Sequence, residues 1–197
     1  ECIVNLDRVL IKDKYNAKAY FIKGMAFKEM GDTAKAVSSF HTTVEQDPDY
    51  FHAYMQLGLL YSIKNNRVAL DYLNSAIKIK PTSIEAWYAA GKFCQDHGLL
   101  EKAKEAYHNI LEMDPEHKNA HYNLGYIHSE YLNDYKTAIE HFSDAIMYAP
   151  NYQEAHYMRG FAFERLKDPK KAEENYRKAL QIDPDFTLAA MGLGRVK

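Results

Sequence analysis

Histidine is the residue type in this chain whose number and spacing most invite a chemical role. There are nine histidines, and imidazole nitrogens are common ligands of Zn²⁺ and other transition metals. His117, His121 and His128 are spaced so that they share roughly one face of a helix. A zinc site needs three or four converging ligands, and no cysteine or carboxylate at a suitable spacing completes this set. The sequence therefore predicts no metal site.

Other signatures of catalysis are incomplete. Gly192 and Gly194 lack the third glycine and the preceding strand that a dinucleotide-binding fingerprint requires. The chain has no glycine-rich phosphate loop and no His-Glu-x-x-His zinc motif. Its few serines fall in expected turns or at exposed helix positions. We therefore expect neither an enzyme nor a bound cofactor.

Charge and hydropathy argue against nucleic-acid binding and membrane insertion. The net charge is −2, from 25 basic and 27 acidic residues mixed along the chain, so no basic stripe marks a nucleic-acid surface. No apolar run approaches the roughly 18 residues of a membrane span, and no signal peptide is visible. Cys2 and Cys94 fall where a small or apolar residue packs, and we expect free thiols. The compartment stays open, with the cytoplasm favoured.

A unit of about 34 residues repeats along the whole chain. Glycine, alanine and proline each recur at nearly this interval, and three residue types in phase over five copies indicate one unit stacked on copies of itself. We expect a single array. Its parts are a half repeat at 1–16, full repeats at 17–50, 51–83, 84–117, 118–152 and 153–186, and a half repeat at 187–197.

Each unit reads as two helices joined by a short turn. In the first full repeat, apolar residues recur every three or four positions over Lys18 to Met30 and again over Thr33 to Gln46. Gly31 and Asp32 end one helix and cap the next, and Pro48 closes the unit. The recurring glycine lies inside the first helix, where closely crossing backbones leave no room for a larger side chain. These glycines are Gly24, Gly58, Gly91, Gly125, Gly160 and Gly194.

Aromatic, small and proline residues fall at fixed positions in every full repeat. In the third repeat they are Trp87, Ala90, Gly91, Cys94, Ala103, Tyr107, Ile110 and Pro115. This pattern resembles the motif of the tetratricopeptide repeat (TPR) family, and the resemblance covers essentially the whole chain. It implies an all-α fold, a right-handed superhelical solenoid of stacked antiparallel helix pairs with about twelve helices.

Three departures from the family motif are visible. The second repeat is one residue short near Asn65, and the fourth is one residue longer near Asn133. Histidine also replaces a motif aromatic, and we expect each imidazole to pack as the aromatic ring would. These histidines are His121, His128 and His156.

The resemblance implies that the first helix of each repeat lines a concave groove for the partner. Two groove positions, followed through five repeats, hold nine aromatic or aliphatic residues out of ten, and contiguous apolar surface usually marks a binding site. Chaperone-binding members clamp a carboxylate with Lys, Asn and Arg, and only Asn123 fits that set. The candidate partner-binding residues are Phe21, Met25, Met55, Leu59, Tyr88, Tyr122, Asn123, Tyr126, Tyr157 and Phe161.

The predicted function is a non-catalytic scaffold that captures an extended or helical segment of a partner protein through apolar anchors. Two alternatives stay open: an assembly subunit that uses convex or end surfaces, and the TPR region of a larger multidomain protein or enzyme. The groove side chains could instead pack on one another across neighbouring repeats. The apolar stretch from Thr187 to Gly194 leads us to expect that a further helix or another subunit covers it, which includes end-mediated homo-oligomers.

Overall fold

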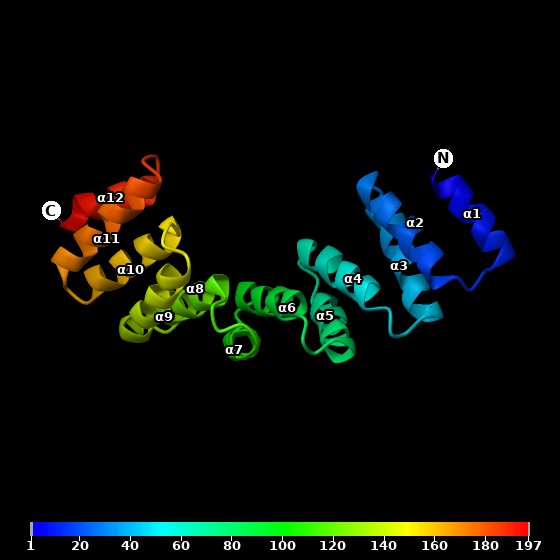
Figure 1. Ribbon diagram of the computed structural model, residues 1–197, viewed down its shortest axis with the longest axis horizontal. Helices are drawn as coiled ribbons and strands as arrows, with labels where there is room; N and C mark the ends of the chain where they lie inside the picture. The colour runs from blue at the N-terminus through cyan, green and yellow to red at the C-terminus, as the bar shows by residue number, and fades with distance from the viewer. Residues whose placement is uncertain (1, 197) are drawn as a thin grey trace. The chain divides into compact units, whose positions relative to one another are not determined.

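The structure is a computed structural model of the 197-residue chain and describes residues 2–196. In this range it is all-α, with twelve α-helices and one π-helical turn (Figure 1). Consecutive helices pack as neighbours within each of two compact units, residues 1–97 and 98–197. The predicted fold class, an all-α array of about twelve paired helices, is confirmed. No helix of the described range is both long enough and apolar enough to cross a membrane.

The first unit holds six helices, each packed on the next one in the chain. Asn16 and Ser83 cap α2 and α6, because their side-chain oxygens accept hydrogen bonds from the backbone N–H groups of Ala19 and Ala86. The helices are α1 (Cys2–Lys12), α2 (Ala17–Glu29), α3 (Thr33–Gln46), α4 (Phe51–Ile63), α5 (Val68–Ile79) and α6 (Ile84–Asp96).

The second unit also places each helix against the next. Asp134 and Asp168 cap α9 and α11 by accepting hydrogen bonds from the backbone N–H groups of Thr137 and Lys171. Its elements are α7 (Leu100–Met113), α8 (Lys118–Tyr126), the π-helical turn η1 (Ile127–Tyr131), α9 (Tyr135–Tyr148), α10 (Gln153–Arg165), α11 (Pro169–Ile182) and α12 (Thr187–Val196).

The turn within a helix pair contains one residue with left-handed backbone geometry. Gly31 has a φ of 77°, which glycine reaches without steric penalty. Asn65 and Asn133 take the same place at a φ of 54°, and asparagine enters this region more readily than most residues. The break predicted at Gly31 is confirmed, because α2 ends at Glu29 and α3 begins at Thr33.

The recurring glycine makes room for a large side chain of the other helix in the pair. A Cβ atom added at Gly24 would lie 2.6 Å from the Phe40 ring, and one added at Gly125 would lie 2.8 Å from the Phe142 ring. Both distances are well inside van der Waals contact, so a larger residue must displace an aromatic ring that is fully buried. The packing reason expected for these glycines is confirmed at both positions.

Gly194 departs from this series. Nothing lies within 4 Å of a Cβ atom added there, whereas one added at Gly192 would lie 2.6 Å from the Tyr176 ring. At Gly24, Gly58, Gly125 and Gly160 the side chain that covers the glycine belongs to the following helix, and α12 is the last helix of the described range. The glycine that packs in α12 is therefore Gly192, which faces the preceding helix.

The extra residue of the fourth repeat is absorbed by the π-helical turn. The sequence places this residue near Asn133, but the structure widens the helix earlier, over Ile127–Tyr131. The backbone N–H of Leu132 donates to the carbonyl of Ile127 at 3.2 Å, which closes the wider turn. Single π-turns of this kind occur frequently at functional sites.

Candidate functional site

Four aromatic residues of the second unit surround one small core cluster. Tyr122 and Tyr126 come from α8, and Tyr157 and Phe161 from α10. All four are half-buried and pack against a cluster formed by Ala138, Phe142 and Met158. We call these four residues the α8–α10 patch. Their rings are held by the core on one side and keep part of their surface in solvent, as anchors for a partner require.

Two rings of the patch contact further aromatic residues that the sequence analysis did not name as candidates. The Tyr122 ring centroid lies 5.0 Å from that of Tyr152, and the Tyr157 centroid lies 5.5 Å from that of Phe186. Tyr152 and Phe186 each stand two residues after the proline that closes a repeat. That offset is a usable sequence signal, because it places an aromatic ring at the same junction in both repeats.

Carboxylates lie beside the Tyr122 phenol of the patch. Burial, followed by the nearby charge of Glu154, holds the pKa of Tyr122 well above its ordinary value. Glu130 also contributes to this rise. Glu130 accepts a hydrogen bond from the Ser129 hydroxyl and Glu154 accepts one from the Gln153 amide, and both donors are uncharged. The edge of the patch beside Tyr122 is thus negatively charged, whereas Arg165 lies over the Phe161 ring and Arg195, which pairs with Glu164, lies near Tyr157.

The first unit holds a smaller counterpart of this arrangement. Phe21 and Met25 of α2 pack against a core cluster that includes Phe40 and Leu57. The Phe21 ring centroid lies 5.0 Å from that of Tyr50, which again stands two residues after the proline that closes the repeat. The same junction therefore pairs a first-helix aromatic with a post-proline aromatic in both units.

The other candidate residues are placed differently. Met55 is 2% exposed and lies inside the core formed by α4, α5 and α6. Asn123 is 6% exposed on α8. Leu59 and Tyr88 are half-buried on α4 and α6. Because Met55 and Asn123 present almost no surface to solvent, the proposal below does not use them as contacts.

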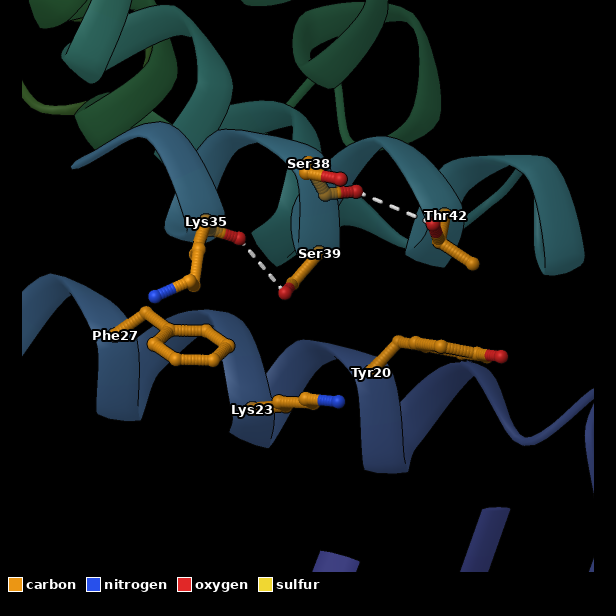
Figure 2. A pocket seen from close by; sticks show the side chains of 7 residues that line it. All are labelled: Tyr20, Lys23, Phe27, Lys35, Ser38, Ser39 and Thr42. Atoms are coloured by element: carbon orange, nitrogen blue, oxygen red, sulfur yellow. Dashed lines mark hydrogen bonds between the residues drawn. The ribbon is translucent and has the colours of Figure 1, made fainter. Parts of the chain in front are cut away.

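A cleft of about 380 Å³ between α2 and α3 offers no catalytic arrangement (Figure 2). Its two lysines are already paired, Lys23 with Asp7 at 2.6 Å and Lys35 with Asp32 at 2.7 Å. The Ser39 hydroxyl on the wall of the cleft donates to a carbonyl of its own helix. Neither a free cation nor an activated hydroxyl therefore points into this cleft from these described residues.

Histidine replaces the first motif aromatic for a reason that the structure makes visible. In the third repeat the Trp87 indole N–H donates to the carbonyl of Pro81 at 2.8 Å. His121 and His156 place Nε2 at 3.0 Å from the carbonyls of Pro115 and Pro150, respectively. An imidazole N–H thus reproduces the hydrogen bond of the indole, which agrees with the expectation that these rings pack in place of an aromatic.

The chain matches family models along most of its length. Three models, each described as tetratricopeptide repeat, match it. One covers residues 21–84 and 95–129, a second covers 119–152, and a third covers 154–186.

Curated relatives are similar at a distance. The chain is 26% identical to the BBSome complex member BBS4 of Bos taurus, over 83% of this chain and 38% of that protein. It is 29% identical to anaphase-promoting complex subunit 3 of Schizosaccharomyces pombe, over 79% of this chain and 24% of that protein. It is 26% identical to protein O-mannosyl-transferase TMTC1 of Homo sapiens, over 62% of this chain and 14% of that protein. The chain thus spans well under half the length of each of these relatives.

Solved structures share the fold. YrrB, described as a TPR protein with an unusual peptide-binding site, superposes with a TM-score of 0.79 at 20% identity, over 94% of this chain and 96% of that one. A MamA protein superposes with a TM-score of 0.79 at 22% identity, over 87% of this chain and 93% of that one.

Proposed function

The chain belongs to the tetratricopeptide repeat family, and from this premise we propose that it is a non-catalytic interaction module that binds a segment of a partner protein on the α8–α10 patch. The observation that carries the proposal is the set of four half-buried rings around one core cluster. Tyrosine and phenylalanine held in this way make effective anchors, because little conformational entropy remains to be lost on binding.

The charge around the patch indicates what kind of segment it accepts. Glu130 is exposed and Glu154 is half-buried, and both raise the pKa of Tyr122 through their negative charge. A segment that carries apolar anchors flanked by lysine or arginine complements the edge beside Tyr122, because opposite charges across an interface favour both encounter and register. An acidic segment would be repelled at this edge, and a chaperone-type carboxylate tail fits it poorly for the same reason.

The relatives support binding to proteins in general. BBS4 is named as a member of one complex and anaphase-promoting complex subunit 3 as a subunit of another. A second candidate function follows from these names: the chain is an assembly subunit whose contacts with neighbouring subunits use other surfaces. Protein O-mannosyl-transferase TMTC1 also carries a similar region, so the repeats can equally be the interaction part of a larger enzyme.

Affinity measurements on anchor variants test the proposal. For a partner segment identified by cross-linking, we expect Tyr126→Ala together with Phe161→Ala to weaken binding about thirtyfold, or about 2 kcal/mol. Tyr15→Ala removes an exposed tyrosine of the first unit and is the matched control. Glu154→Lys should weaken the binding of a basic segment, although it removes no aromatic contact. If the loss of both Tyr126 and Phe161 leaves the affinity of a genuine partner unchanged, the partner binds elsewhere.

A further inference from the structure

Two histidines and one aspartate converge between the helices of the fourth repeat. His121 lies on α8, and His141 and Asp144 lie on the facing helix α9. One potential ligand atom from each of the three residues falls within 4.8 Å of the other two. The three residues come from two helices that pack against each other, so the cluster is built by the helix pair and not by one helix face.

The hydrogen bond of His121 leaves its other ring nitrogen ready to act as a ligand. Nε2 lies 3.0 Å from the Pro115 carbonyl, which can only accept, so the ring proton sits on Nε2. Nδ1 then carries a lone pair. It is buried and has no hydrogen-bond partner among the described residues, although an Asp144 carboxylate oxygen lies 3.5 Å away. A lone pair and a carboxylate repel each other unless a cation, either a proton on Nδ1 or a metal ion, stands between them.

His141 offers a second buried nitrogen of the same kind. Its Nδ1 has no hydrogen-bond partner among the described residues, and its ring centroid lies 5.9 Å from that of His121. Neutral imidazole is the form that binds a metal, and the unpaired Nδ1 of His141 can serve as the second ligand.

We propose that His121, His141 and Asp144 form a binding site for a divalent transition-metal ion, with Zn²⁺ as the ion that fits best. Two imidazoles and one carboxylate are a common three-ligand set for Zn²⁺. The Pro115 carbonyl that fixes the tautomer of His121 is the type of outer partner that metal-binding histidines have. The Asp144 side chain is 45% exposed, so an ion and a fourth ligand from water can enter from that side.

The distances allow the ion to bind with small side-chain movements. Zn–N and Zn–O bonds of about 2.0–2.2 Å place two tetrahedral ligands about 3.3 Å apart. Closing the separation of up to 4.8 Å requires each side chain to move by about 1 Å. The bound ion would link α8 to α9, and its effect would be to stabilise the fourth repeat.

The fifth repeat is a natural control for this site. His156 also places Nε2 at 3.0 Å from a proline carbonyl, and its Nδ1 is also buried without a hydrogen-bond partner among the described residues. On the facing helix, however, Asn175 and Lys178 stand where the fourth repeat has His141 and Asp144. An ammonium group in place of a carboxylate opposes a cation, so this repeat retains the imidazole without the site.

Titration of the untagged full chain with Co²⁺ and Zn²⁺ tests the proposal. We expect one equivalent of Co²⁺ to bind with the visible d–d bands of a four- or five-coordinate site, and Zn²⁺ to displace it. His141→Asn with Asp144→Lys copies the fifth repeat, whose fold tolerates these residues, and should weaken binding at least about a hundredfold. His52→Gln removes an exposed histidine of the first unit and should leave binding unchanged.

The fifth repeat also allows the site to be built a second time. Arg159 donates to the Asn175 side chain at 2.8 Å, so it must be replaced together with Asn175. The variant Arg159→Leu, Asn175→His and Lys178→Asp gives this repeat the residues of the fourth, and we expect two bound ions per chain. The proposal is overturned if the unmodified chain binds no stoichiometric ion, or if His141→Asn with Asp144→Lys binds it as tightly.

Discussion

In the fourth repeat Gly125 packs on the Phe142 ring, and in the fifth repeat Gly160 packs on the Tyr176 ring. Both first helices also carry a histidine in their first turn that bonds to the preceding proline carbonyl. The two repeats therefore share one packing frame, made by a glycine, an aromatic ring and an imidazole N–H. This frame explains why both repeats fold alike although most of their residues differ.

The two repeats differ at the polar positions that face this shared imidazole. The fourth repeat places His141 and Asp144 there, whereas the fifth places Asn175 and Lys178. The fifth repeat also has Arg159, which bonds to Asn175. The same frame thus holds a candidate cation site in one copy and a positively charged network in the next. The lesson is that recurring residues specify the fold, and the residues between them specify the chemistry.

The largest effect is expected from a substitution that disrupts the shared packing of glycine on an aromatic ring. Gly125→Leu must push its side chain against a ring that a Cβ atom alone would approach to 2.8 Å. We expect a loss of about 3 kcal/mol in the free energy of unfolding, measured by urea denaturation. Gly194→Ala is the control, because nothing lies within 4 Å of the added Cβ atom, and it should be neutral or stabilising by up to about 1 kcal/mol. Equal losses in both variants would contradict the packing assignment.

Addition of zinc should stabilise the protein through the fourth repeat and not through the fifth. At a free Zn²⁺ concentration one hundred times the dissociation constant, an ion bound only to the folded state stabilises it by about 2.7 kcal/mol. We expect a rise of this order in thermal stability, and none in His141→Asn with Asp144→Lys. Binding to histidines of the unfolded chain reduces the effect in both proteins. A rise of the same size in the variant would place the ion elsewhere.

Acidification should have a smaller effect, centred on His141. Its pKa is about 4 in the folded protein, mainly because of burial and then through His121, His128 and His108, against an ordinary value of 6.5. Between these values the unfolded chain binds more protons, so the contribution to stability is complete above pH 6.5 and is lost as pH falls towards 4.

After allowance for solvent screening, we expect a loss on the order of 1 kcal/mol between pH 7 and pH 4.5 that His141→Asn reduces. The lowered pKa of His156 contributes in the same direction and should remain in that variant. Unfolding free energies at several pH values measure the difference. If the two proteins lose stability in parallel, the environment assigned to His141 is incorrect.

Much of the fold could be predicted because its determinants recur. A glycine near position 8 of each unit and a proline at its end set the phase of the helices, and the turn at Gly31 follows from the same signal. The π-helical turn over Ile127–Tyr131 could not be located, since one extra residue can be absorbed at any point between two helices. The packing of Gly192 in place of Gly194 could not be foreseen either, because spacing alone does not say which glycine is covered.

The same holds for the candidate sites, because some of their residues could be predicted from the sequence and others could not. The residues of the α8–α10 patch could be named because first-helix positions recur from one repeat to the next. The partners Tyr152 and Phe186 were missed because they stand in the junctions. The sequence argument against a metal considered ligands near His121 along one helix. His141 and Asp144 lie on the facing helix, and only the pairing of α8 with α9 brings them close.

Site-specific photo-cross-linking is the most direct test of partner binding at the α8–α10 patch. Benzoylphenylalanine would replace Tyr126 in one protein and the exposed Tyr15 in another, and the cross-linked partner peptides would be identified by mass spectrometry. The account predicts that Tyr126 cross-links to one recurring partner segment with apolar anchors and neighbouring lysine or arginine residues, and that Tyr15 does not. Cross-links to a partner that form from Tyr15 and are absent at Tyr126 would contradict it.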